Sequence, residues 1–204
     1  KKYIKSMVTS GYIHKIRKNL YTCLDLSSND DYADRFQIAS TINKNSYVAY
    51  HSAFEFYGFY NQVYNRMQIA TDKKFAPFDY DDYSYDCYLN GIDIQIETIK
   101  HSRVTTIERT IIDSINLLGK VMDIEELVKC LDLICFVGER SLIEMLKAYD
   151  KEVLYRKVGY ILSFYKEEFK LNDSFFDLCL KKGVICNNGS LVNHDKSSLV
   201  YDYT

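Results

Sequence analysis

The sequence lacks any apolar run that approaches the roughly 18 residues of a membrane-spanning helix. It also lacks a targeting segment, an internal repeat and a low-complexity stretch. These absences favour a globular protein of the cytoplasm that does not associate with membranes. The 204 residues, of which 47% are hydrophobic, suit one domain, or one domain with a small module.

Motifs for cofactor and metal chemistry are missing as well. None of the six cysteines forms a CxxC pair, so we expect buried free thiols in a reducing compartment rather than disulfides. The histidines show no ligand spacing to any cysteine, which predicts no metal site. No phosphate-binding G-x-x-x-x-G-K-[ST] and no dinucleotide-binding G-x-G-x-x-G motif is present. The sequence therefore predicts no cofactor and no enzymatic activity.

Acidic residues are absent from the first 24 positions. These positions carry a net charge of +6, whereas the remainder of the chain carries −8. The total of −2 by itself argues against a nucleic-acid-binding protein, but the asymmetry suggests a basic contact module on an acidic body. We therefore expect two parts, residues 1–26 and residues 27–204.

Local patterns in the basic part predict a helix followed by a β-hairpin. Residues 2–10 carry one apolar stripe, and Gly11 is well suited to end a helix. Strands are expected near residues 12–16 and 20–24, and Asn19 tolerates the positive φ of such a turn. A helix followed directly by a hairpin is the second half of a winged helix-turn-helix, in which the helix enters the major groove of DNA.

Basic side chains in such a module would bind DNA, because neutralising phosphates supplies most of the affinity. The predicted DNA-contacting residues are Lys1, Lys2, Lys5, His14, Lys15, Arg17 and Lys18. One alternative is a solvated basic hairpin on a protein whose acidic, tyrosine-rich body binds a protein partner without DNA. The residues alone leave both interpretations open.

The next part of the chain predicts a mixture of helices and strands. We expect a helix near 30–43, a strand at 47–50, a short helix capped by Ser52 and ended by Gly58, a strand at 66–71, and an exposed acidic loop at 72–86. The pair Asn90-Gly91 then predicts a two-residue hairpin turn, since isoleucines alternate with polar residues after it.

Helix signals dominate from residue 105 onward. Thr105 and Glu108 have capping-box spacing, Gly119 ends that helix, and Asp123 caps the next. Further helices are expected at 124–136, 140–149, 152–169 and 174–182, with a turn and short strands at 184–193. The predicted fold class is α+β: a partial winged helix-turn-helix (recognition helix plus β-hairpin wing), then a mixed α/β domain with a helical C-terminal half.

Two groups of residues resemble catalytic sites. Asp93 and Glu97 fall near a metal-nuclease pattern, but Lys100 stands one position late, so a solvated strand edge is the simpler explanation. His51 and Ser52 are adjacent and lack the G-x-S-x-G elbow of a nucleophilic serine. We therefore predict no catalytic residue, and keep a metal-dependent nuclease only as a remote alternative.

Two further patterns are explained by structural roles. Arg109 and Asp113 are spaced i, i+4 on one predicted helix, which favours an ion pair. The aromatic run from Tyr47 to Tyr64 would suit base stacking, but core packing is the more common role of such a run.

Four short motifs carry a resemblance to a known family. In chain order they are KKYIKSMVTSGYIHKIRKNLYTC, YHSAFEFYG with the strand after it, ERTIID, and YRKVGYIL. Together they are similar to the AbiEi family, the antitoxins of type IV abortive-infection toxin–antitoxin systems. The matching positions are Met7, Val8, Gly11, Ile13, Arg17, Tyr21, His51, Ser52, Ala53, Gly58, Thr71, Glu108, Arg109, Thr110, Asp113, Arg156, Gly159, Tyr160 and Leu162.

The resemblance implies a bifunctional protein without catalysis. The winged helix would bind double-stranded promoter DNA, at inverted repeats, and act as a transcriptional regulator that represses its own operon. The remaining domain would neutralise a cognate nucleotidyltransferase toxin in phage defence, with or without a stable complex. The motif residues between His51 and Tyr160 would then serve the structure of that domain.

Overall fold

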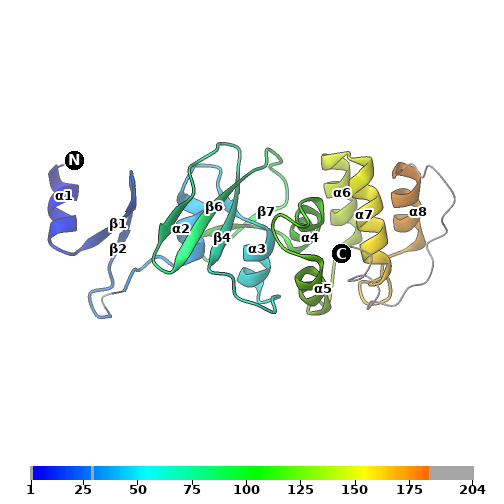
Figure 1. The fold of residues 1–204 in the computed structure, drawn as a ribbon, viewed down its shortest axis with the longest axis horizontal. Coiled ribbons are helices and arrows are strands. Elements are labelled where there is room, and N and C mark those ends of the chain that lie inside the picture. Colours follow the sequence, from blue (N-terminus) through cyan, green and yellow to red (C-terminus); the bar gives the residue numbers. More distant parts are fainter. Residues whose placement is uncertain (1, 29, 184–204) are drawn as a thin grey trace.

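The computed structural model describes residues 2–28 and 30–183, excluding the side chain of Lys2. These residues form eight helices and two sheets, which follow one another along the long axis of the molecule (Figure 1). This content confirms the α+β class. The turn and strands expected at 184–193 lie outside the described residues.

The elements alternate in the first half and are helical in the second. The strands are β1 (Ile13–Arg17), β2 (Leu20–Cys23), β3 (Tyr47–Val48), β4 (Arg66–Thr71), β5 (Phe78–Tyr80), β6 (Tyr83–Leu89), β7 (Ile96–Ile99) and β8 (Ser102–Thr105). The helices are α1 (Lys2–Thr9), α2 (Arg35–Thr41), α3 (Tyr50–Tyr57), α4 (Ile107–Asn116), α5 (Ile124–Asp132), α6 (Glu139–Tyr149), α7 (Glu152–Ser163) and α8 (Asp173–Lys182).

The larger sheet contains six strands in the order β5-β6-β4-β3-β8-β7. Its centre is mixed, because β4 runs parallel to β6 and antiparallel to β3, while β3 runs parallel to β8. Strands β5 and β7 complete the two edges by antiparallel pairing with β6 and β8. A mixed sheet of this kind depends on pairings between segments that are distant in the sequence.

Alternate side chains of the central strands supply two hydrophobic cores. Val48 and Ile69 belong to the core that contains α2, whereas Tyr47 and Ala70 belong to the core of the helical half. Successive strand residues point to opposite faces, so one short strand serves both cores. The sheet therefore stands between the N-terminal elements and helices α4 to α8 (Figure 1).

Helix α1 and the hairpin β1–β2 form the N-terminal module. Gly11 (φ 71°) and Asn19 (φ 66°) adopt the positive φ values that the sequence predicts. Ile16 is buried in the same core as α2, so the hairpin lies on the body of the molecule. The side chains from Tyr3 to Thr9 on α1 are all exposed, and a complete winged helix-turn-helix is not confirmed.

Two segments differ from the prediction. Residues 72–86 are not one loop, because β5 and β6 pair across a turn at Asp81 (φ 52°). Asn90-Gly91 does not form a hairpin, since β6 pairs with β4 and β7 pairs with β8. Oδ1 of Asn90 instead accepts a hydrogen bond from the backbone N of Ile92 at 3.0 Å, a turn that leads the chain away from β6.

The observed helix ends agree in part with the ends that the sequence predicts. Asp123 caps α5 by accepting a hydrogen bond from the backbone N of Glu126, and Gly58 (φ 83°) ends α3, as predicted. The cap of α4 is Thr106 rather than Thr105, which belongs to β8. Helices α2, α5 and α7 are shorter than the hydrophobic periodicity indicates.

The cysteines in the described residues are free thiols, as predicted. Cys130 and Cys179 are buried, but Cys23 and Cys135 are exposed, so the expected burial is wrong for the latter two. No helix within residues 2–28 and 30–183 has both the length and the apolarity needed to cross a membrane.

The aromatic run mostly supplies core residues. Tyr47, Tyr50 and Phe54 are buried in the core of the helical half, whereas Tyr60 is 37% exposed. Core packing is therefore the main role of this run, as predicted.

Candidate functional site

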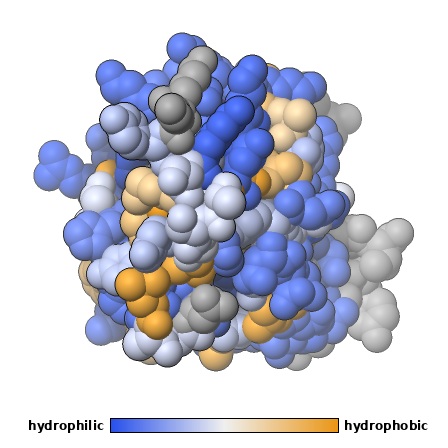
Figure 2. Space-filling model, turned by 90° about the vertical axis from the view of Figure 1, so that its left-hand side faces the viewer, coloured by the Kyte–Doolittle hydropathy of each residue, from blue (hydrophilic) through white to orange (hydrophobic). Residues whose placement is uncertain are grey.

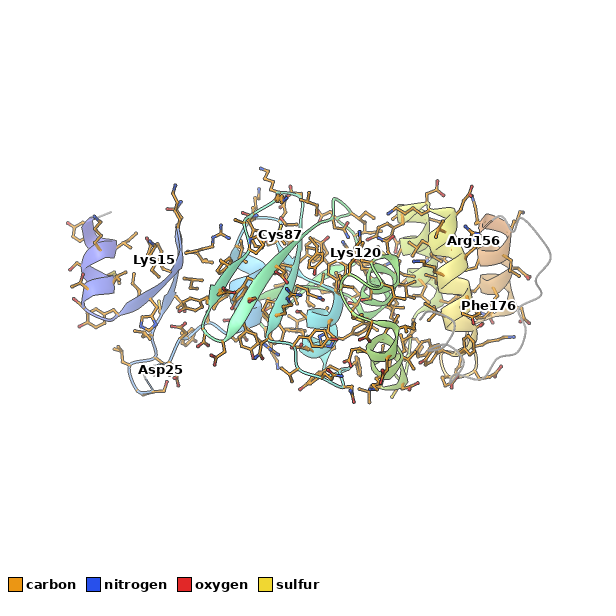
Figure 3. All side chains as sticks on the ribbon, in the orientation of Figure 1. Lys15, Asp25, Cys87, Lys120, Arg156 and Phe176 are labelled. Carbon is orange, nitrogen blue, oxygen red and sulfur yellow. The ribbon has the colours of Figure 1, made fainter. Side chains whose placement is uncertain are left out.

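The basic residues of the N-terminal module lie at one end of the molecule. Lys5 on α1, and Lys15 and Lys18 on the hairpin, are all exposed. Figure 3 shows Lys15 on this hairpin, at the end of the structure opposite α7 and α8. Lys1 and the side chain of Lys2 lie outside the described residues. The exposed lysines are free to meet a polyanion.

Arg17 has a different surrounding from these lysines. Its side chain is partly buried, and its guanidinium lies 4.8 Å from the ring centre of Phe78 and 5.4 Å from that of Phe75. A cation over an aromatic face is attracted to the ring. Arg17 therefore holds the hairpin to the body, and its predicted contact with DNA stays a prediction.

His14 is also held by the body. Its Nδ1 lies 2.9 Å from Oδ1 of Asp31, and the hydroxyl of Tyr80 donates a hydrogen bond to the other oxygen of Asp31. These three residues line an open pocket of about 560 Å³, together with Asp34 and Arg35. The prediction that His14 contacts DNA does not fit this acidic neighbourhood.

Apolar side chains accompany the basic ones on α1. Ile4, Met7 and Val8 are exposed by 37–44%, and Tyr3 by 85%. Figure 2 views this end of the molecule and shows orange patches set among blue, hydrophilic atoms. A cluster of this kind on a protein surface is typical of an interaction site.

Arg109 and Asp113 form the ion pair that their spacing predicts. Nε of Arg109 donates to Oδ2 of Asp113 at 3.2 Å, and both side chains are fully buried. The hydroxyl of Tyr149 donates to the other carboxylate oxygen at 2.6 Å. This hydrogen bond joins α4 to the end of α6.

The guanidinium of Arg109 also holds the segment between β6 and β7. It donates to the backbone oxygens of Ile92 and Ile94, and to the hydroxyl of Tyr47 on β3. Backbone oxygens in a segment without strand pairing need such donors. Arg109 is therefore a structural residue, which agrees with its predicted role.

The other residues of this motif fix α4 to its neighbours. Oε1 of Glu108 accepts a hydrogen bond from the backbone N of Gly138 at 2.8 Å, just before α6 begins. The hydroxyl of Thr110 lies 2.7 Å from that of Thr105, at the end of β8. Each contact joins α4 to a neighbouring segment of the chain.

Ser52 ties α3 to β4 and is not a helix cap. Its Oγ accepts from the backbone N of Gln68 at 2.9 Å and donates to the backbone oxygen of Arg66 at 3.2 Å. The side chain of Gln68 then accepts from the backbone N of His51 and donates to the oxygen of Val121. The predicted cap is wrong because Ala49 precedes the helix.

His51 is buried between two glutamates. Its Nδ1 lies 2.9 Å from Oε1 of Glu55, and its Nε2 lies 3.1 Å from Oε1 of Glu126 on α5. The Tyr64 ring stacks on the imidazole with 3.8 Å between ring centres. The first contact has ion-pair distance but not the direction of a ring N–H hydrogen bond, because Nδ1 has no hydrogen-bond partner among the described residues.

The pKa of the buried Glu126 carboxyl is lowered. Burial raises its pKa, but hydrogen bonds from His51 and from the backbone N of Asn61 and Gln62 lower it further, so the net pKa is below the usual value. Sγ of Cys130 lies 3.7 Å from the same carboxylate oxygen. Burial and the neighbouring charge of Glu126 raise the pKa of this thiol.

The last motif lies where α7 meets α8. A Cβ on Gly159 would stand 2.8 Å from Cβ of Cys179, so only glycine permits this approach of the helices. Arg156 packs its methylenes against Gly183 at the end of α8, and Tyr160 is partly buried. These residues serve helix packing.

The nuclease interpretation finds no support in the geometry. Asp93 has an exposed side chain in the segment before β7, and its nearest cation is Arg103, at 3.7 Å. Glu97 is exposed on β7, and Lys100 lies in the turn that follows. The three residues do not share a strand face.

Sequence reasoning missed several partners of the predicted residues. Glu126, Cys130, Gln68 and Tyr149 come from other elements, and only Glu126 and Cys130 carry a signal, since they are one turn apart on a helix. The sequence shows no ligand spacing between histidine and cysteine, yet the fold brings His51 next to Cys130.

A scan against protein-family models finds no match, and no curated protein matches the sequence.

Proposed function

We propose that this protein is the antitoxin and transcriptional repressor of a type IV toxin–antitoxin system. The observation that carries the proposal is the acid-free N-terminal module, which folds as a helix followed by a hairpin with exposed lysines. The motifs that resemble the AbiEi family support the antitoxin part. The protein would act in the cytoplasm without catalysis.

Promoter DNA would meet the module at this end of the molecule. Lys5 would approach the groove with α1, while Lys15 and Lys18 would contact phosphates with the hairpin. Arg17 would contribute indirectly, since it fixes the hairpin on the body. The lysines that remain exposed are therefore the phosphate-contacting set.

The acidic body would meet the toxin. Residues 25–204 carry a net charge of −8, so long-range attraction would favour a partner with a basic surface. The repression and neutralisation functions would thus belong to oppositely charged parts of one chain.

Growth of cells that express the proposed toxin tests the antitoxin part. The protein encoded beside this one is expressed alone and together with the full chain, and we expect rescue of growth only in the second case. The double variant Lys15→Gln/Lys18→Gln should still rescue growth while repressing a promoter reporter less. Failure of the full chain to rescue growth contradicts the antitoxin proposal.

One observation favours a second candidate function. The exposed Ile4, Met7 and Val8 on α1 would also suit a protein partner, in a module that does not bind DNA. Rescue of growth without any binding to promoter DNA would favour this alternative.

A further inference from the structure

Three side chains with metal-ligating atoms converge between α3 and α5. They are His51, Glu126 and Cys130, all buried, and their ligand atoms lie within 4.8 Å of one another. Glu126 and Cys130 stand one helical turn apart on α5, so both face the same neighbour. His51 on α3 supplies the third atom. Nitrogen, oxygen and sulfur together are the donor set that zinc accepts.

The separations suit a tetrahedral metal ion. Zinc binds sulfur at about 2.3 Å and nitrogen or oxygen at about 2.0–2.2 Å, which sets neighbouring ligand atoms roughly 3.3–3.6 Å apart. Oε1 of Glu126 lies 3.1 Å from Nε2 of His51 and 3.7 Å from Sγ of Cys130. The ligand atoms of His51 and Cys130 lie within 4.8 Å of each other, and a bound ion would draw them to the tetrahedral separation.

The surroundings of His51 resemble the outer shell of a metal site. A metal-ligating histidine usually has its second ring nitrogen against a carboxylate, which fixes the ring and its tautomer. Oε1 of Glu55 lies 2.9 Å from Nδ1 of His51, at ion-pair distance but not in the direction of a ring N–H hydrogen bond, and the Glu55 carboxylate is held by Arg35 at 2.7 Å. The Tyr64 ring covers one face of the imidazole.

One carboxylate oxygen lacks a partner. Oε2 of Glu126 is buried, and no hydrogen bond reaches it from the described residues. A buried carboxylate oxygen without a partner is costly, and a bound cation would supply the missing partner. Hydrogen bonds to Oε1 alone therefore do not account for this cluster.

We propose that His51, Glu126 and Cys130 bind one zinc-class divalent ion. The thiol of Cys130 releases its proton to solvent as the sulfur–metal bond forms, while His51 ligates through Nε2 and Glu126 through both carboxylate oxygens, so that Oε2 gains a partner. The ion would tie α3 of the sheet half to α5 of the helical half. This inference is independent of the proposed function.

Metal binding by the purified full chain tests the proposal. The chain is incubated with Zn²⁺ or Co²⁺, dialysed, and analysed for metal content and for the charge-transfer absorption that thiolate gives with Co²⁺. We expect about one ion per chain, the thiolate band, and a higher melting temperature with Zn²⁺. Loss of the band in Cys130→Ser, but not in Cys179→Ser, locates the site, since Cys179 is also buried.

The variant Glu126→Gln is a second test of the site, which still applies if Cys130→Ser does not fold. It keeps the shape of the side chain and should lower Co²⁺ affinity by tenfold or more while the far-ultraviolet spectrum stays native. A wild-type chain that retains no metal after dialysis overturns the proposal. So does a Cys130→Ser variant, or a folded Glu126→Gln variant, that binds Co²⁺ as the wild type does.

Discussion

The guanidinium of Arg17 lies 4.8 Å from the ring centre of Phe78, and this interaction fixes the hairpin on the body. We predict that Arg17→Gln lowers the free energy of unfolding by about 1–2 kcal/mol, because the variant removes a partly desolvated cation–π interaction. Lys15→Gln, on the same strand but exposed, should change it by less than about 0.5 kcal/mol. Urea unfolding of both variants measures the difference, and equal losses contradict the assignment.

The buried carboxylate of Asp113 has Arg109 and Tyr149 as its partners. Asp113→Asn should destabilise the protein by roughly 3–5 kcal/mol, since it leaves the Arg109 charge buried without a counter-ion. Asp93→Asn is the matched control, because its ion pair with Arg103 is exposed and should contribute about 0–1 kcal/mol. Thermal unfolding distinguishes the two; a small effect at Asp113 is inconsistent with a structural role.

Because the helices pack closely at Gly159, we predict that any side chain at this position lowers the stability of the protein. Gly159→Ala would bring a Cβ to 2.8 Å from Cβ of Cys179, and we expect a loss of about 1–3 kcal/mol from overpacking. Gly91→Ala adds the same atom where nothing lies within 4 Å, so it should leave stability unchanged or raise it. Comparison of the melting temperatures checks this order, and its reversal argues against the close approach of the two helices.

Buried tyrosines predict loss of stability in alkali. Burial raises the pKa of Tyr50, Tyr149 and Tyr165 above the usual 10.0, so the folded state keeps their protons while the unfolded chain releases them. Their contribution to stability is complete below pH 10.0 and is lost as pH rises through the folded pKa values. The last phenolates to form should therefore appear together with the loss of circular dichroism, and complete ionisation of the tyrosines in a still-folded chain contradicts this.

Local signals explain why much of the fold could be predicted. Gly11, Asn19 and Gly58 mark chain turns through their own backbone preferences, and Asp123 caps α5 within three residues. The β5–β6 hairpin was missed because its acidic composition is typical of loops. Strand β8 carries no strong alternation and depends on pairing with β3 and β7.

At the candidate sites, too, local spacing predicts some contacts, while contacts between distant residues were not predicted. The Arg109–Asp113 pair follows from its i, i+4 spacing, but Tyr149 reaches Asp113 from 36 positions away. Glu126 reaches His51 from 75 positions away, which no spacing rule covers. Interactions set by the mixed sheet and by helix packing therefore required the structure.

DNA binding by the N-terminal module is the central claim, and the salt dependence of promoter binding tests it most directly. Fluorescence anisotropy with DNA from upstream of the gene is measured at a series of salt concentrations for the wild type, Lys15→Gln/Lys18→Gln, and Lys181→Gln/Lys182→Gln. The second pair is also exposed but lies at the end of α8, far from the hairpin (Figure 1).

We predict that the slope of log affinity against log salt falls by roughly 0.9 for each phosphate that the Lys15/Lys18 variant no longer neutralises. The Lys181/Lys182 variant should keep the wild-type slope. Equal slopes for all three proteins, or a wild-type chain that does not bind the promoter, would contradict the account.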